Sequence, residues 1–231
     1  MKLLDDEALE RSAVVANCRM NRERNLLGSN GYDREIGFDP LAFLKARAAA
    51  DHAVTWLDLC CGTGRALIQA AEMAHGEGSN AAIVGVDLVG MFDRPASVLS
   101  CLRLVEASLS TWQADHPFDL ITCVHGLHYV GDKLGLIARA ASWLAGDGLF
   151  VASLDQHNLK IGGSQSARRI VSELRRAGFL YYTRRRLVSC RGRKQMSLSY
   201  RYLGADDTAG PNSTGQPAVD SYYEVVGEAR R

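Results

Sequence analysis

The stretch Leu57-Asp-Leu-Cys-Cys-Gly-Thr-Gly-Arg-Ala-Leu67 decides how the rest of the chain is interpreted. The apolar run at residues 54–59 predicts a strand, and the periodicity of residues 64–75 predicts a helix. A strand that passes through a glycine turn into a helix directs backbone N–H groups and the positive end of the helix dipole at a ligand. The stretch therefore predicts a ligand site at Gly62 and Gly64.

Two common ligands of such turns are excluded by the residues that follow. The dinucleotide pattern G-x-G-x-x-G requires a third glycine, and Leu67 stands in its place. The phosphate-binding loop requires Gly-Lys followed by Ser or Thr, which this turn lacks. Because both patterns bind a diphosphate, the turn favours a less anionic ligand.

Acidic residues at the ends of the next two predicted strands indicate a nucleoside. The second strand, residues 82–87, ends at Asp87, and the third ends in Val105-Glu-Ala-Ser-Leu109. Beside the first strand, Asp87 would accept hydrogen bonds from two ribose hydroxyls and disfavour a 2′-phosphate, while the third segment suits the adenine edge. The pattern predicts a nucleoside site without a phosphate clamp.

From residue 53 onward, apolar runs alternate with helical patterns, which indicates βαβ units and a parallel sheet. We expect a helical N-terminal cap or lid at 1–52, a catalytic domain at 53–203 and an irregular tail at 204–231, all within one globular domain. The remaining predicted elements are strands at 102–106, 119–124 and 149–153, helices at 5–20, 41–50, 133–144 and 166–177, and an edge hairpin of 180–188 with 197–203.

Five ordered motifs resemble those of the class I S-adenosylmethionine-dependent methyltransferases. They are LDLCCGTG at 57–64, GVDL at 85–88, VEASL at 105–109, FDLITCVHGLHYV at 118–130 and LAGDGLFVASL at 144–154. The resemblance covers roughly residues 53–203. It implies an α/β, Rossmann-like fold: a mostly parallel seven-stranded sheet with its last strand antiparallel. It also implies S-adenosyl-L-methionine as methyl donor and S-adenosylhomocysteine as product.

The resemblance also assigns cofactor-binding residues. These are Tyr32, Asp58, Cys60, Cys61, Gly62, Gly64, Asp87, Leu88, Glu106, Ala107, Ser108 and Cys123. The family usually has glycine where Cys60 stands, and a cysteine fits there provided that its φ is negative. We expect Cys60 to pack under the turn and Cys61 to lie beside the methionine end of the cofactor. Tyr32, in the lid, would contact that same end or else belong to a surface loop.

The exit of the fourth strand carries the only paired histidines, His125 and His128. Ligands of open parallel sheets lie beyond the carboxyl ends of the strands, so these histidines are candidate catalytic bases for an acceptor hydroxyl or amine. The alternative is that part of the stretch simply caps the next helix. We expect no metal, because His-x-x-His has no obvious carboxylate partner here.

The charge is unevenly distributed along the chain, although the formal net charge is only +1. Between Arg168 and Arg201 lie eleven basic residues and one acidic residue, interleaved with tyrosines. This pattern is typical of a nucleic-acid face or of a solvated sheet edge guarded by basic side chains. No RNA-binding module or nucleobase-methylation motif accompanies it, so we favour the solvated edge.

The predicted function is methyl transfer to O, N or C of a small-molecule acceptor, in specialised metabolism. An RNA (rRNA or tRNA) methyltransferase using the basic segment is the alternative, and a non-catalytic cofactor-binding subunit is the third. No window is apolar enough to span a membrane, and the six cysteines form no C-x-x-C pair, so we expect a cytoplasmic protein with reduced thiols. The sequence leaves the oligomeric state open.

Overall fold

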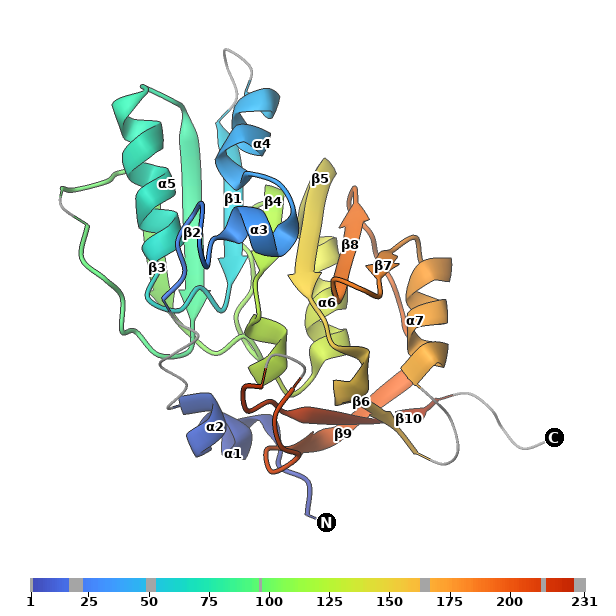
Figure 1. Cartoon of the computed structure of the whole chain (residues 1–231). Coiled ribbons are helices and arrows are strands. Elements are labelled where there is room, and N and C mark those ends of the chain that lie inside the picture. Colours follow the sequence, from blue (N-terminus) through green and yellow to red (C-terminus); the bar gives the residue numbers. More distant parts are fainter. Residues whose placement is uncertain are drawn as a thin grey trace.

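The computed structural model describes residues 2–16, 23–48, 53–95, 97–162, 167–212 and 215–226. A seven-stranded sheet of order β3-β2-β1-β4-β5-β8-β7 forms its centre (Figure 1). Strands β1 to β5 are parallel, whereas β8 runs antiparallel to β5 and β7, which confirms the predicted fold class. The strands are β1 Val54–Leu59, β2 Ala81–Asp87, β3 Leu102–Glu106, β4 Phe118–Cys123, β5 Leu144–Ser153, β7 Leu180–Tyr182 and β8 Leu187–Arg191.

The five parallel strands form where the sequence has its apolar runs. All six residues of β4 are buried, as expected for a parallel strand that is covered on both faces. The strand β5 begins at Leu144, earlier than predicted, because Leu144 already pairs with Phe118 across an irregular register. The apolar runs therefore give the positions of these strands, and the pairing with β4 sets where β5 begins.

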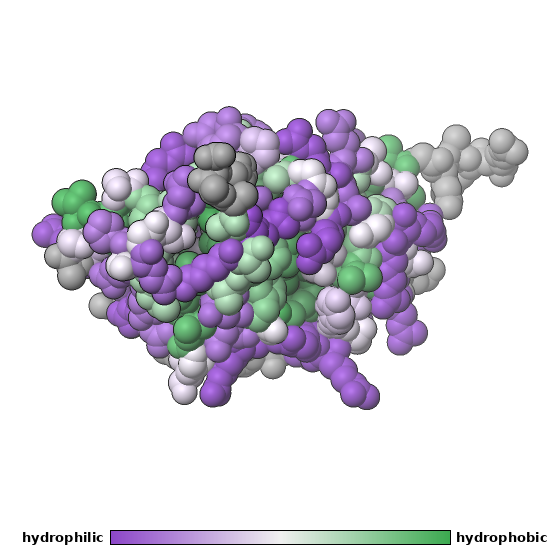
Figure 2. All heavy atoms as spheres, turned by 90° about the horizontal axis from the view of Figure 1, so that it is seen from above, coloured by the Kyte–Doolittle hydropathy of each residue, from purple (hydrophilic) through white to green (hydrophobic). Residues whose placement is uncertain are grey.

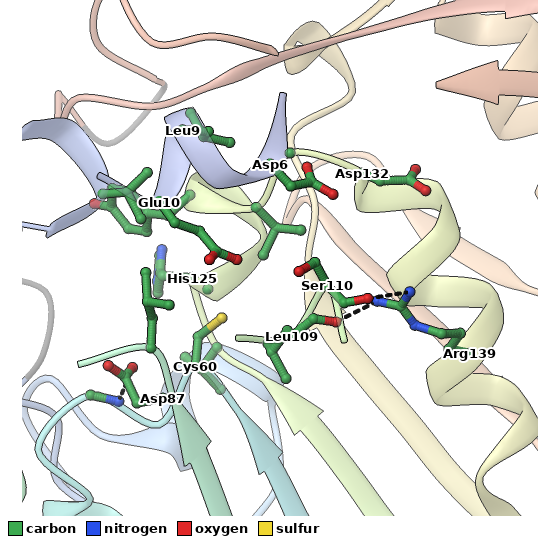
Figure 3. A pocket seen from close by; sticks show the side chains of 18 residues that line it. Asp6, Leu9, Glu10, Cys60, Asp87, Leu109, Ser110, His125, Asp132 and Arg139 are labelled. Atoms are coloured by element: carbon green, nitrogen blue, oxygen red, sulfur yellow. Dashed lines mark hydrogen bonds between the residues drawn. The ribbon is translucent and has the colours of Figure 1, made fainter. Parts of the chain in front are cut away.

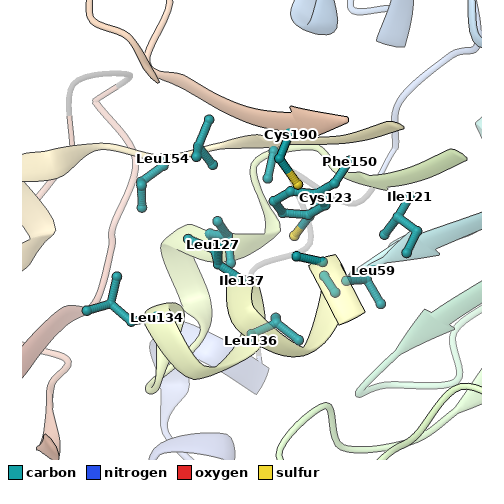
Figure 4. Close-up of a cluster of buried hydrophobic side chains, with 14 of the residues drawn as sticks. Leu59, Ile121, Cys123, Leu127, Leu134, Leu136, Ile137, Phe150, Leu154 and Cys190 are labelled. Atoms are coloured by element: carbon teal, nitrogen blue, oxygen red, sulfur yellow. The ribbon is translucent and has the colours of Figure 1, made fainter. Parts of the chain in front are cut away.

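Helices cover both faces of the sheet (Figure 1). On one face, α3 (Tyr32–Ile36), α4 (Pro40–Arg47) and α5 (Arg65–Gly76) pack around the fully buried Trp56. On the other, α6 (Lys133–Ser142) and α7 (Ala167–Arg176) contribute to the larger cluster. Figure 4 shows part of it, with Leu127 and Ile137 gathered near Phe150 and Cys123. Because helices cover both faces of the sheet, a ligand site can form only at the ends of the strands.

The predicted edge hairpin is wrong in its second strand. The partner of β7 is β8, and residues 180–188 split between the two because Arg186, at φ 50°, reverses the chain between them. Tyr200–Asp206 forms β9, which belongs instead to a separate three-stranded sheet of order β6-β10-β9. The reversal inside 180–191 completes the main sheet before β9 is reached.

The tail predicted to be irregular from residue 204 contains a packed strand. β10 (Asp220–Val225) pairs antiparallel with β9 and parallel with β6 (Leu159–Ile161), which follows the 3₁₀ turn η2 (Gln156–Asn158). Tyr223 of β10 is almost completely buried against the main core. The polar composition of residues 207–217 conceals this strand in the sequence, because the apolar burial begins only at Ala218.

The N-terminal region is divided between two places. Helices α3 and α4 lie on the sheet, but α1 (Asp6–Glu10) and α2 (Ala13–Ala16) lie near the carboxyl ends of the parallel strands (Figure 1). A bridge between Leu4 and Ala205 joins this part to β9. The helix predicted at 5–20 is thus two short helices as far as residue 16, and residues 17–22 lie outside the described part.

The amino ends of the parallel strands lie at the opposite end of the molecule. Figure 2 looks onto this face, where hydrophilic residues surround a smaller hydrophobic area. Near the amino end of β4, Arg47 forms ion pairs with Asp119 and Asp147. Within the described ranges, no helix combines the length and the apolarity that crossing a bilayer requires.

Candidate active site

A cavity lies at the carboxyl ends of the parallel strands (Figure 3). Its walls come from the glycine turn after β1, the end of β2, the loop after β3, the exit of β4, and helices α1 and α6. The cavity lies where an open parallel sheet binds ligands, beyond the carboxyl ends of its strands.

The glycine turn requires left-handed backbone at three nearby positions. Gly62 and Gly64 have φ of 61° and 74°, and a Cβ at Gly64 would approach Leu104 to 2.9 Å. Cys60 has φ 58°, so the condition of a negative φ is not met, and the cysteine adopts the conformation that glycine would adopt freely. Gly62 and Cys60 line the cavity, whereas Gly64 begins helix α5 against the sheet.

Asp87 is held against the glycine turn. Its Oδ2 accepts a hydrogen bond from the Gly62 N–H at 2.9 Å, and its Oδ1 accepts one from the Val89 N–H at 3.0 Å. Asp87 and the following Leu88 both line the cavity. The structure thus brings together the glycine turn and the acid at the end of the second strand, which the sequence pointed to separately.

Asp58 and Tyr32 meet in the core and do not line the cavity. The Tyr32 hydroxyl donates to Asp58 Oδ2 at 2.7 Å, and the Thr122 hydroxyl donates to Asp58 Oδ1. Burial raises the pKa of Asp58 to about 7 and also raises the pKa of Tyr32. Tyr32 is therefore a buried partner of Asp58, and its side chain does not line the cavity.

The segment expected at the adenine, residues 105–109, reaches the cavity wall at its last residue. Glu106 is exposed and lies against Gly90, and the Ala107 N–H donates to the Asp87 carbonyl. The Ser108 hydroxyl donates to Glu10 Oε1 at 2.5 Å. The cavity wall is made by Leu109, the last residue of that segment, and by the next residue, Ser110.

The two adjacent cysteines have the opposite placements to those predicted. Cys60 lines the cavity, whereas Cys61 is buried in the core on the α5 side of the sheet. A hydrogen bond with the buried Cys123, together with burial, raises the pKa of the Cys60 thiol. Because the reactive species of cysteine is the thiolate, this environment keeps Cys60 unreactive.

His125 and His128 have different surroundings although their rings are 5.6 Å apart. His125 has φ 59° and lines the cavity, and its Nε2 lies 2.9 Å from Glu35 Oε2. His128 is buried within the 3₁₀ turn η1 (Gly126–Tyr129), and burial lowers its pKa to about 3. Only His125 is therefore placed to meet a ligand in the cavity.

Several cavity residues were not expected from the sequence. Helix α1 contributes Asp6 and Glu10, and the N-terminus of α6 contributes Asp132 (Figure 3). Burial, and next the charge of Asp132, raise the pKa of Asp6. The guanidinium of Arg139 lies on the same wall, where it donates to the Leu109 carbonyl at 2.5 Å. No local pattern marks these residues, because they reach the site from two helices, α1 and α6, that are distant in sequence.

Comparisons with known proteins agree with this architecture. A family model described as a methyltransferase domain matches residues 24–190. No curated protein matches the sequence at a significant level.

Solved structures similar to the chain share little sequence with it. The N-methyltransferase NodS from Bradyrhizobium japonicum, in complex with S-adenosylhomocysteine, is 15% identical with a TM-score of 0.47, over 83% of this chain and 98% of that one. Phosphoethanolamine N-methyltransferase 1 of Haemonchus contortus is 16% identical with a TM-score of 0.48, over 77% and 42%. The plantazolicin methyltransferase BpumL is 12% identical with a TM-score of 0.40 over 51% of this chain, and the match spans 45% of the BpumL chain.

Proposed function

The chain belongs to the methyltransferase-domain family, and we propose that it transfers the methyl group of S-adenosyl-L-methionine to an O, N or C atom of a small-molecule acceptor. The observation that carries the proposal is the position of Asp87. Its carboxylate is fixed by the Gly62 and Val89 N–H groups at the wall of the cavity. S-adenosylhomocysteine is then the product, and the cytoplasm and specialised metabolism are where we place the reaction.

The cavity residues fit an uncharged nucleoside better than a nucleotide. A carboxylate on the glycine turn accepts hydrogen bonds from ribose hydroxyls, and the same charge repels a diphosphate. In this proposal Asp87 holds the ribose, the backbone of Cys60 and Gly62 approaches the cofactor closely, and Leu109 and Ser110 flank the base. When bound, S-adenosyl-L-methionine supplies an electrophilic methyl group on a sulfonium.

His125 is the residue that we assign to proton transfer. It lines the cavity at the exit of β4 and is a general base for an acceptor hydroxyl or ammonium group. His128 is kept neutral by burial and does not line the cavity, so we give it a packing role. The other cavity residues position the acceptor and exclude water from it.

The charge of the cavity walls supports a small acceptor over RNA. The side chains of Asp6, Glu10 and Asp132 place carboxylates around the space next to the glycine turn. Phosphates of a nucleic-acid backbone would be repelled there, whereas a neutral or cationic molecule would not. The basic residues between Arg168 and Arg201 are absent from this wall.

Turnover with a panel of acceptors tests the proposal. The purified protein and S-adenosyl-L-methionine are incubated with phenols, catechols, primary and secondary amines, and separately with tRNA and rRNA, and S-adenosylhomocysteine is quantified. We expect turnover of at least one small-molecule class and none of RNA. Methylated RNA without turnover of any small acceptor would overturn the proposal.

A variant of His125 tests its role in the same assay. With an acceptor that loses a proton, His125→Ala should lower kcat by ~10²-fold or more, the range of a general base. Affinity for S-adenosylhomocysteine should stay within about twofold of the wild type. Unchanged turnover would assign His125 to structure alone.

A further inference from the structure

We propose that Glu35 is the positioning residue of His125, holding the imidazole so that Nε2 carries the proton and Nδ1 faces the acceptor. The inference rests on the proposed function and deepens it, because it names a residue of helix α3 as part of the proton-transfer apparatus. The contact that motivates it joins residues 90 positions apart, His125 Nε2 and Glu35 Oε2, at 2.9 Å.

His125 is held in a conformation that costs energy. A residue other than glycine at φ 59° is less stable by ~1–2 kcal/mol than in the right-handed region. The side chain is only 14% exposed and lies at the wall of the cavity. Strain of this kind persists only where the surroundings fix the residue, and the Glu35 carboxylate contacts the ring.

Glu35 is itself held at its side chain and at its backbone. Arg24 donates to the second carboxylate oxygen, Oε1, at 2.9 Å, and the Arg24 side chain is 12% exposed. Arg185 reaches from the β7–β8 turn and donates to the carbonyls of Arg34, at 2.8 Å, and of Glu35, at 3.3 Å. One carboxylate oxygen and the end of helix α3 are therefore fixed, and the other oxygen is presented to His125.

The close approach of Arg185 to the helix end is visible in the backbone as well. Helix α3 ends at Ile36 and is capped by Gly37, which has φ 89°. A Cβ at Gly37 would lie 2.1 Å from Arg185 Nη1, so the guanidinium occupies the space that a side chain would need. One arginine of the basic segment thus has a structural partner beside the site.

The chemistry of the pair fixes the tautomer of the imidazole. The hydrogen bond from His125, ahead of the opposing effect of burial, lowers the pKa of Glu35, so Glu35 is a carboxylate at neutral pH and accepts only. Nε2 must then carry the hydrogen, which leaves the lone pair on Nδ1. When Nδ1 takes the proton of an acceptor hydroxyl or ammonium group, the imidazolium forms next to a fixed negative charge.

Other groups near His125 do not place a negative charge against the imidazole as directly as Glu35 does. His128 from η1 faces the ring but is neutral. Cys60 from the glycine turn is a thiol, Tyr129 from η1 is a phenol, and Glu10 from α1 shares the cavity but is bonded to Ser108. Arg24 lies behind Glu35 and pairs with its other oxygen.

Nuclear magnetic resonance of the ring nitrogens tests the pair without an acceptor. Protein labelled with ¹⁵N-histidine, free and with S-adenosylhomocysteine, should show one downfield Nε2–H proton that is protected from solvent exchange. Its loss in His125→Asn assigns it. The signal should disappear in Glu35→Ala and persist in Glu77→Gln, a matched variant that breaks the exposed ion pair with Lys45. A proton on Nδ1 of His125, or an unchanged signal in Glu35→Ala, would overturn the proposal.

Kinetics with an acceptor from the panel then separate positioning from folding. Glu35→Gln, which keeps the shape of the side chain, should lower kcat by ~10- to 100-fold, while KM and affinity for S-adenosylhomocysteine change less than twofold. In a His125→Ala background the same substitution should add nothing, because both act through one group. Additive losses would contradict the proposal. A wild type that shows the Nε2–H signal but binds no S-adenosylhomocysteine would overturn the proposed function and not the pair.

Discussion

Asp58 carries a carboxyl group into the centre of the molecule. It is fully buried, and its two oxygens accept hydrogen bonds from Tyr32 and Thr122. Trp56 in turn donates to the Thr122 hydroxyl at 2.8 Å, so the group belongs to a closed network. Burial raises the pKa of Asp58 to about 7, although the hydrogen bonds from Thr122 and Tyr32 act in the opposite direction.

The raised pKa predicts how stability depends on pH. Between about pH 4 and pH 7 the folded protein holds a proton that the unfolded chain releases, so the free energy of unfolding due to Asp58 falls as the pH rises. Replacing Asp58 by asparagine removes this titration. Urea unfolding should show Asp58→Asn gaining up to ~3 kcal/mol relative to the wild type from pH 4.5 to pH 7.5. A difference that stays constant over this range would contradict the assignment.

Cys60 shares its space with Gly126 at the wall of the cavity. A Cβ at Gly126 would lie 2.4 Å from the Cβ of Cys60 and 2.8 Å from the Sγ of Cys123. The glycine turn and the exit of β4 are thus packed without room for one more methyl group.

This packing predicts a coupled pair of substitutions. Gly126→Ala should lower the free energy of unfolding by ~1–3 kcal/mol through overpacking. In a Cys60→Gly background, which removes the nearest atoms, the same change should cost at least about 1 kcal/mol less. Gly76→Ala, with no atom within 4 Å of the new Cβ, is the matched control and should be neutral or stabilising. Equal losses in both backgrounds, measured by denaturant unfolding, would count against the contact.

Individual site residues differ in how far the sequence could reveal them. Asp87 could be found because it ends a strand next to the strand of the glycine turn, and parallel strands align their ends. Glu35 could not, because it meets His125 only after α3 packs on the sheet. The conformation of Cys60 was also missed, since a cysteine gives no local sign of a positive φ.

Strand β10 connects the second sheet to a wall of the cavity through hydrogen bonds. Ser221 is fully buried, and its hydroxyl donates to the Gly131 carbonyl at 2.5 Å and accepts from Lys133 Nζ at 2.7 Å. Lys133 also donates to the carbonyls of Val130 and Val219. Three acceptors satisfy an ammonium whose pKa burial lowers to about 7.

The hydroxyl of Ser221 should therefore matter for stability. Ser221→Ala leaves the Gly131 carbonyl without its donor and Lys133 without one acceptor, and should cost ~1–3 kcal/mol. The exposed Ser199 provides the control, because its alanine variant should change the free energy of unfolding by less than ~0.5 kcal/mol. Thermal and urea unfolding of both variants make the comparison. A Ser221→Ala protein as stable as the control would refute the role of this strand.

Secondary-structure elements were predictable where burial is continuous. β1, β2, β3 and β4 lie within a residue of their apolar runs. β9 and β10 were misassigned because their partners are distant in sequence and a polar loop separates them. Local apolar patterns therefore predict the positions of β1 to β4. The pairing of β9 and β10 depends on contacts between distant residues, which local patterns do not show.

Several arginines of the basic segment form contacts within the folded chain. Among the described basic residues, Arg186 pairs with Asp155, Arg193 donates to the Leu144 carbonyl, and Arg201 pairs with Glu224. The sequence predicted the charge asymmetry correctly, but only the fold shows that these arginines have partners within the chain.

This distribution predicts weak binding of RNA by the whole protein. At about 150 mM salt, tRNA should bind no more tightly than ~10⁻⁴–10⁻⁶ M, the range of non-specific contacts. Filter binding across a salt series measures both affinity and slope. A Kd below ~10⁻⁷ M, with affinity falling steeply as salt rises, would instead favour an RNA methyltransferase.

Calorimetry with S-adenosylhomocysteine examines the nucleoside site most directly. The wild type should bind one equivalent, and Asp87→Ala should weaken binding by ~1–3 kcal/mol, about 5- to 150-fold, because ribose hydroxyls lose their acceptor. Asp115→Ala, at an exposed carboxylate paired with Arg103, should bind like the wild type. Absence of heat with both S-adenosyl-L-methionine and S-adenosylhomocysteine, or equal affinity of the Asp87→Ala protein, would contradict the account.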